Sequence, residues 1–110
     1  MAKVTALDQT WLRDLVGRIV QRYRPLRVVL FGSYARGDYS AFSDLDLLLV
    51  LAQAPDWYKR GLEFRRFLQE EPVPIEAHIY TSEEYERMKK LENPFLLQIE
   101  SEGKVLYEQQ

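Results

Sequence analysis

An apolar run that opens with two carboxylates constrains the fold of this chain more than any other sequence feature. Residues 44–51 read Asp-Leu-Asp-Leu-Leu-Leu-Val-Leu, and Asp44 and Asp46 are their only polar side chains. Such a run is typical of a largely buried strand. Because side chains alternate along a strand, we expect both carboxylates on one face, with Cα atoms roughly 6.6 Å apart. Carboxylates this close repel each other unless a cation lies between them, which predicts ligands for divalent metal ions.

Composition limits which metals the chain can bind. It contains no cysteine and one histidine, His78, which excludes thiolate zinc sites, a cysteine nucleophile and multi-histidine metal sites. Any metal is therefore held mainly by oxygen, which favours Mg²⁺ or Mn²⁺. The formal net charge of −2 argues against stable nucleic-acid binding through bulk positive charge.

The length and hydropathy of the chain predict its organisation. A length of 110 residues predicts one domain over 1–110. No stretch approaches the ~18 apolar residues of a membrane span. Residues 1–5 lead into a polar helix pattern without the apolar region of a signal peptide, so we expect a cytoplasmic protein.

Hydrophobic periodicity predicts the secondary structure. We expect helices over 7–23, 57–69, 82–90 and 94–102, strands over 26–31, 44–51, 75–80 and 104–107, and a turn or one helical turn within 34–43. Asp8 or Thr10 is the expected cap of the first helix, and Asn93 that of the last.

The same patterns predict which helical side chains are buried. In the second long helix we expect burial of Leu62, Phe64, Phe67 and Leu68. We expect Trp57 and Tyr58 to pack on the core; the alternative is that they stack on a base or contact a partner. In the last helix we expect Phe95, Leu96 and Ile99 to face the core. We expect solvent exposure for Arg65, Arg66, Lys89 and Lys90.

A small polar segment between the first two strands predicts a phosphate cradle. Gly32 and Ser33 end the first strand, and glycine allows a close approach of the backbone to a ligand. Ser33 adds a hydroxyl donor, and Arg36 follows three residues later, where it can reach an anion at the same turn. The alternative is ordinary turn chemistry.

Taken together, these residues carry a family resemblance. Gly-Ser-Tyr-Ala-Arg-Gly at 32–37, followed by Ser-Asp-Leu-Asp-Leu at 43–47, resembles the signature of the DNA polymerase β-like nucleotidyltransferases and their small branch, the minimal nucleotidyltransferase (MNT) family. The resemblance implies an α+β fold whose mixed sheet has the core strand order 1-2-3, flanked by helices. It also implies a third carboxylate on the third strand, where this chain has Glu76 instead of the usual aspartate.

The resemblance assigns a role to each candidate site residue. Asp44, Asp46 and Glu76 would be catalytic and would hold two Mg²⁺ ions, and Glu76 could act as general base. Gly32, Ser33, Arg36 and Ser43 would bind the nucleotide, for which the resemblance favours ATP over another nucleoside triphosphate. Two alternatives stay open: Glu76 as a surface carboxylate, and His78 as a partly buried structural side chain instead of a contact for metal, phosphate or acceptor.

The resemblance also implies a partner. MNT proteins are commonly paired with helical HEPN ribonucleases in toxin–antitoxin modules, so we expect AMP transfer from ATP to a hydroxyl, with a tyrosine of a HEPN toxin as acceptor. Homo- or hetero-oligomers are compatible with this function. One alternative is an antitoxin that blocks its partner by contact, with little or no catalysis. Another is a nucleotidyltransferase acting on a small molecule of the aminoglycoside type.

Overall fold

The structure is a computed structural model that describes residues 9–110. Its elements run in the order α2 (Gln9–Tyr23), β1 (Arg27–Phe31), α3 (Ser33–Arg36), β2 (Leu45–Leu51), α4 (Trp57–Leu68), β3 (Ile75–Thr81), α5 (Ser82–Lys90), α6 (Pro94–Glu102) and β4 (Lys104–Glu108). The expected elements are confirmed, and their ends within the described range differ by no more than one residue. The expected cap Asp8 lies outside the described residues, and Thr10 lies inside α2 instead of capping it.

The four strands form one mixed sheet in the order β3-β2-β1-β4. β1 runs antiparallel to both β2 and β4, whereas β2 and β3 run parallel. A parallel pair needs a crossover connection, which α4 supplies here. The predicted neighbours β1, β2 and β3 are confirmed, and β4 adds a strand beside β1.

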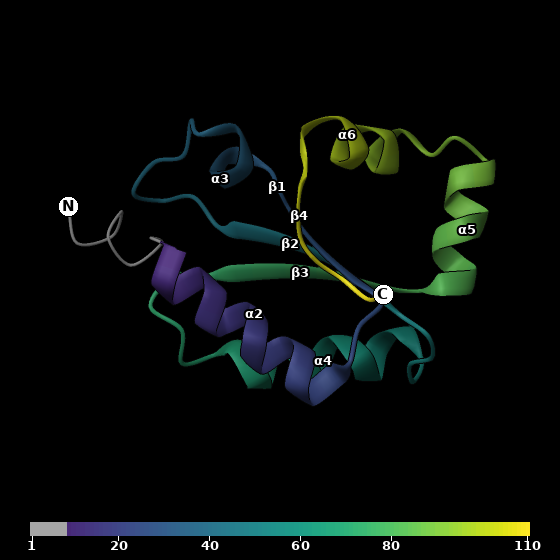
Figure 1. Cartoon of the computed structure of the whole chain (residues 1–110), viewed down its shortest axis with the longest axis horizontal. Coiled ribbons are helices and arrows are strands. Elements are labelled where there is room, and N and C mark those ends of the chain that lie inside the picture. Colours follow the sequence, from purple (N-terminus) through teal and green to yellow (C-terminus); the bar gives the residue numbers. More distant parts are fainter. Residues whose placement is uncertain (1–8) are drawn as a thin grey trace.

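Helices cover both faces of the sheet: α2 and α4 lie on one face, and α5 and α6 on the other (Figure 1). Alternate strand residues feed two separate cores. The core beneath α2 and α4 includes Leu15, Ile19, Leu47, Leu49 and Phe64. The core beneath α5 and α6 includes Phe31, Leu48, Val50, Tyr85, Leu96 and Ile99, with Phe95 packed against it. Asp46 has the same parity as Leu48 and Val50, so its side chain belongs to the α5–α6 face.

Local capping fixes the helix ends in the second half of the chain, and the predicted cap Asn93 is confirmed. The Asn93 side chain accepts hydrogen bonds from two backbone N–H groups at the start of α6, and Pro94 occupies the first helical position. Thr81 and Glu84 form a reciprocal capping box at the start of α5. Gly103 ends α6, where the chain turns directly into β4.

The burial predictions for α4 are partly wrong. Trp57, Tyr58 and Leu62 are 59%, 73% and 39% exposed. The prediction holds for Phe64, Phe67 and Leu68, which are buried or half-buried. α4 packs beside β3, the edge strand, so only one narrow stripe of the helix is covered. Arg60 takes a place in that stripe and is 8% exposed.

The basic pairs Arg65–Arg66 and Lys89–Lys90 are exposed, as expected. Among residues 9–110, no helix combines the length and the apolar character that crossing a membrane requires.

Candidate functional site

The strand topology brings three chain segments to one end of the sheet. The parallel strands β2 and β3 both begin there, and the antiparallel β1 ends there. Asp46, the second residue of β2, is paired in register with Phe31 on one side and with Glu76 on the other. The carboxylates of two neighbouring strands therefore lie beside the turn that follows β1.

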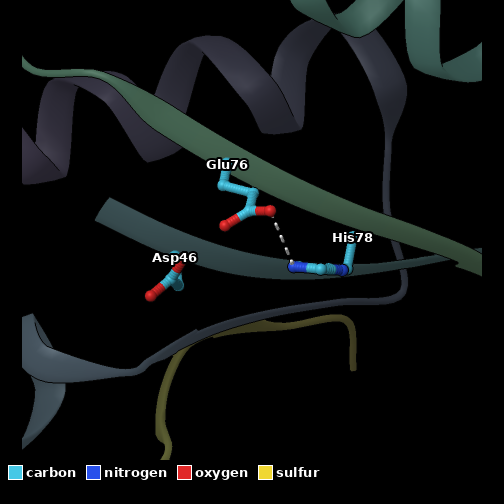
Figure 2. Close-up of side chains that lie close together, drawn as sticks. All are labelled: Asp46, Glu76 and His78. Atoms are coloured by element: carbon cyan, nitrogen blue, oxygen red, sulfur yellow. Dashed lines mark ion pairs between the residues drawn. The ribbon is translucent and has the colours of Figure 1, made fainter. Parts of the chain in front are cut away.

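Asp46, Glu76 and His78 form the candidate metal centre. One ligand atom from each residue can be chosen so that all three atoms lie within 4.8 Å of one another. Figure 2 shows the side chains converging from β2 and β3, with His78 Nε2 3.9 Å from a carboxylate oxygen of Glu76. The His78 ring also contacts the rings of Phe31 and Phe95, with centroids 5.5 and 5.1 Å apart. His78 is thus both a half-buried packing residue and a member of the acidic cluster.

The electrostatics of this cluster suit a cation. Burial, then the hydrogen bond and negative charge of Glu76, and to a smaller extent the charge of Asp44, together raise the pKa of Asp46 to about 6, against a small opposing effect of Arg36. Burial lowers the pKa of His78, against the opposing effect of Glu76. Two carboxylates that repel each other beside a neutral imidazole form a donor set that fits a divalent cation. A positive charge between them would relieve that repulsion.

Asp44 lies at the margin of the cluster. β2 begins at Leu45, one residue later than expected, so Asp44 precedes the strand and is exposed, whereas Asp46 is half-buried. Asp44 is not one of the three clustered ligands, although its charge contributes to the raised pKa of Asp46. It lines a groove of about 800 Å³ together with Glu76 and His78, bounded on the other side by α4.

Gly32 lies directly against Asp46. Its backbone has φ 78° and ψ −159°, a conformation that is essentially restricted to glycine. A Cβ atom built on Gly32 would lie 3.0 Å from Asp46 Cγ and closer still to Oδ2. The sequence predicted that this glycine allows a close approach to a ligand, and in this structure the group that approaches is the Asp46 carboxylate itself.

Ser33 and Ser43 differ in their surroundings. Ser33 is the first residue of α3 and is partly buried, beside Gly32. The Ser43 hydroxyl accepts a hydrogen bond from the backbone N–H of Ser40 at 2.9 Å, which closes the turn before β2. The structure thus places Ser33 at the Gly32 turn and gives Ser43 a role in the neighbouring loop.

Arg36 leads to a residue that the sequence did not identify. Its guanidinium group forms ion pairs with Asp38 at 3.2 Å and with Glu102 at 3.1 Å. A carboxylate oxygen of Glu102 also accepts the backbone N–H of Gly32 at 3.0 Å. Glu102 lies 70 residues from Gly32 at the end of α6, and no local sequence signal connects the two.

Comparisons with known proteins agree with this geometry. Residues 12–107 match the family model described as nucleotidyltransferase domain. A Methanocaldococcus jannaschii protein named "Putative protein adenylyltransferase" is 33% identical over 102 residues, which cover 91% of this chain and 98% of that protein.

Solved structures share the fold at lower identity. A chain in the crystal structure of a toxin-antitoxin with AMP-PNP superposes with a TM-score of 0.56 at 17% identity, covering 89% of this chain and 74% of that one. A chain in the structure of a tri-AMPylated Shewanella oneidensis HEPN toxin in complex with an MNT antitoxin gives 0.53 at 14%, covering 92% and 73%. Because the family model spans almost the whole chain and the homologue is matched along nearly its full length, the chain belongs to the nucleotidyltransferase domain family.

Proposed function

We propose that this nucleotidyltransferase transfers AMP from ATP to a hydroxyl group of a protein. The observation that carries the proposal is the position of Asp46, which lies between the Gly32 turn and the cluster of Glu76 and His78. This arrangement puts the residues proposed as metal ligands beside the turn proposed to bind phosphate. The homologue named as a protein adenylyltransferase supports AMP as the transferred group and protein as the acceptor.

Asp44, Asp46 and Glu76 would hold the Mg²⁺ ions, and His78 is placed to join them as a neutral ligand. Bound Mg²⁺ would supply charge neutralisation at the triphosphate and a lowered pKa of the acceptor hydroxyl. Mn²⁺ has similar ligand preferences and would be held by the same residues.

The remaining residues bind and orient the reactants. Gly32, Ser33 and Arg36 would bind the phosphates that become pyrophosphate, and Ser43 would shape the loop beside them. The acceptor oxygen attacks the α-phosphorus, a new P–O bond forms, and the bond to the β-phosphate bridging oxygen breaks. Glu76, exposed at the edge strand, would take the proton of the hydroxyl.

We further propose that the acceptor is a tyrosine of a HEPN-type toxin and that the protein acts as the antitoxin. The solved complex of an AMPylated HEPN toxin with an MNT antitoxin, which shares this fold, supports the choice of partner. A groove between α4 and the edge strand β3 is lined by Asp44, Glu76 and His78, and we propose it as the place where a segment of the partner binds.

Mass spectrometry tests this function. The protein is incubated with ATP, Mg²⁺ and its co-encoded helical neighbour, and both chains are weighed. We expect the neighbour to gain the mass of one or more AMP groups, and the double variant Asp44→Asn/Asp46→Asn to abolish the gain. If that double variant protects cells from the neighbour as well as wild type, and no AMP is transferred, the protein acts by contact. Labelling of a small molecule without any partner would instead favour the aminoglycoside-type alternative.

A further inference from the structure

Glu102 binds the two groups that the proposed function assigns to the triphosphate, the backbone N–H of Gly32 and the guanidinium group of Arg36. Its carboxylate accepts the Gly32 N–H at 3.0 Å, and both of its oxygens lie 3.1 Å from Arg36 Nη1. The side chain is only 15% exposed, whereas that of Arg36 is 42% exposed. A carboxylate thus lies where a phosphate oxygen would find a backbone donor and a guanidinium group.

The Glu102 carboxylate and a bound phosphate would compete for the same hydrogen-bond donors. Arg36 also donates from Nε to Asp38 at 3.2 Å, so two carboxylates share its guanidinium group. Arginine binds phosphate best through two parallel N–H bonds, and it cannot offer Nη1 in full to both Glu102 and a phosphate. A triphosphate at this turn would also be repelled by the negative charge of Glu102.

The backbone around Glu102 is fixed, so its side chain is the part that can move. The next residue, Gly103, donates its N–H to Ile99 O at 2.7 Å. A Cβ atom on Gly103 would lie 2.5 Å from the same oxygen and 2.7 Å from Val29 Cγ1, which shows how closely this corner packs. Rotation of the Glu102 side chain would release Arg36 without displacing α6 or β4.

We propose that Glu102 is an internal competitor of the nucleotide's phosphates and sets the affinity of the site for them. This inference rests on the proposed function, because it takes Gly32 and Arg36 as phosphate ligands. Glu102 holds Arg36 and the Gly32 turn in place before the nucleotide arrives, and its carboxylate leaves when the β- and γ-phosphates bind.

Calorimetric titration with AMP-PNP and Mg²⁺ tests the competition without requiring catalysis. Glu102→Gln keeps an oxygen that can accept the Gly32 N–H but removes the charge, so we expect AMP-PNP to bind about three- to tenfold more tightly. Glu86→Gln is the matched control, since Glu86 is an exposed residue of α5 that loses the same charge away from the site. In an Arg36→Ala background, Glu102→Gln should change the affinity much less.

The outcomes separate this inference from the function on which it rests. Unchanged or weaker AMP-PNP binding by a folded Glu102→Gln variant overturns the competitor role and leaves the proposed function standing. Absence of AMP-PNP binding by wild type and variants alike removes the phosphate site, and both proposals fail together. Should Glu102→Gln fold poorly, Glu102→Asp serves instead. Its side chain is one methylene shorter and its carboxylate lies further from Gly32 N and Arg36 Nη1, so we again expect tighter AMP-PNP binding, and unchanged binding would contradict the competitor role.

Discussion

Replacing Gly32 by alanine would place a methyl group where the turn after β1 meets the Asp46 carboxylate. The backbone conformation at Gly32, φ 78° and ψ −159°, costs a non-glycine residue about 1–3 kcal/mol. The new Cβ would also lie 3.0 Å from Asp46 Cγ and 3.3 Å from Asp46 Cβ, which is tighter than ordinary van der Waals contact. The carboxylate must therefore move away from the turn by at least a few tenths of an ångström.

Two effects follow from this displacement. The strain alone should lower the melting temperature, by about 4–8 °C per kcal/mol in a domain of this size. The shift of Asp46 should reduce AMP transfer by about 10- to 100-fold, because misplacing a reacting or ligating group by up to 1 Å has costs of that order. Thermal denaturation and the rate of AMP transfer measure the two effects separately.

Gly37→Ala is the matched control. Gly37 also has a positive φ of 91°, but a Cβ atom there would meet nothing within 4 Å. Gly37→Ala should lower the free energy of unfolding by about 1–2 kcal/mol because of the left-handed backbone, and should leave Asp46, Glu76 and His78 in place. If Gly32→Ala and Gly37→Ala reduce transfer equally at equal folded fraction, the contact between Gly32 and Asp46 has no part in the activity. In an Asp46→Ala background the stability cost of Gly32→Ala should fall, because the carboxylate that clashes is gone.

Three further measurements address charge, helix stability and burial. Because the pKa of Asp46 is about 6 in the fold against an ordinary 3.8, the folded chain binds more protons between those values, and stability without metal falls as pH rises through that window. The melting temperature should therefore differ more between pH 4.5 and pH 7.5 for wild type than for Asp46→Asn. Mg²⁺ should raise the melting temperature more at pH 7.5 than at pH 4.5. Equal pH dependence of the melting temperature in the two proteins would contradict the raised pKa of Asp46. Gly61→Ala in α4 should raise stability by about 0.5–1 kcal/mol, since its Cβ meets nothing within 4 Å, and a lower melting temperature would refute the open geometry. Arg60→Ala removes a 2.8 Å ion pair with Glu84 and hydrogen bonds to two backbone carbonyls, so it should lower the free energy of unfolding, measured in urea, by about 2–4 kcal/mol. The control Arg66→Ala, at an exposed position, should change the free energy of unfolding by under about 0.5 kcal/mol.

The elements that the sequence predicts well are those with local signals. The apolar runs that become β1 and β2 are bounded by a proline, a glycine and two carboxylates, so their limits are fixed within a few residues. Asn93 and Pro94 are likewise a local signal, and they mark the start of α6. The predicted burial of Trp57, Tyr58 and Leu62 is wrong because periodicity identifies the apolar face of a helix but does not show how much of that face a neighbouring element covers.

The site divides along the same line. Gly32 and Asp46 belong to short motifs, Glu76 was expected from the family resemblance, and strand pairing brings the three together. Glu102 belongs to no motif: it reaches the Gly32 turn only because β4 adds to β1 and carries the end of α6 with it. Contacts over 70 residues depend on the whole topology, and a single sequence contains no local signal of them.

The charges around Gly32 explain why metal and nucleotide would act together. On one side of Gly32, the carboxylates of Asp46 and Glu76 repel each other because no positively charged side chain among residues 9–110 lies between them. On the other, Arg36 is held by Asp38 and Glu102, two anions that a phosphate would have to replace. In the proposed function, a complex of Mg²⁺ with a triphosphate would supply both missing partners at once: the cation would relieve the repulsion between the carboxylates, and the phosphates would replace Asp38 and Glu102 at the guanidinium group. Either component alone would correct only one half of the imbalance, so we expect the proposed site to bind the two together more tightly than either one alone.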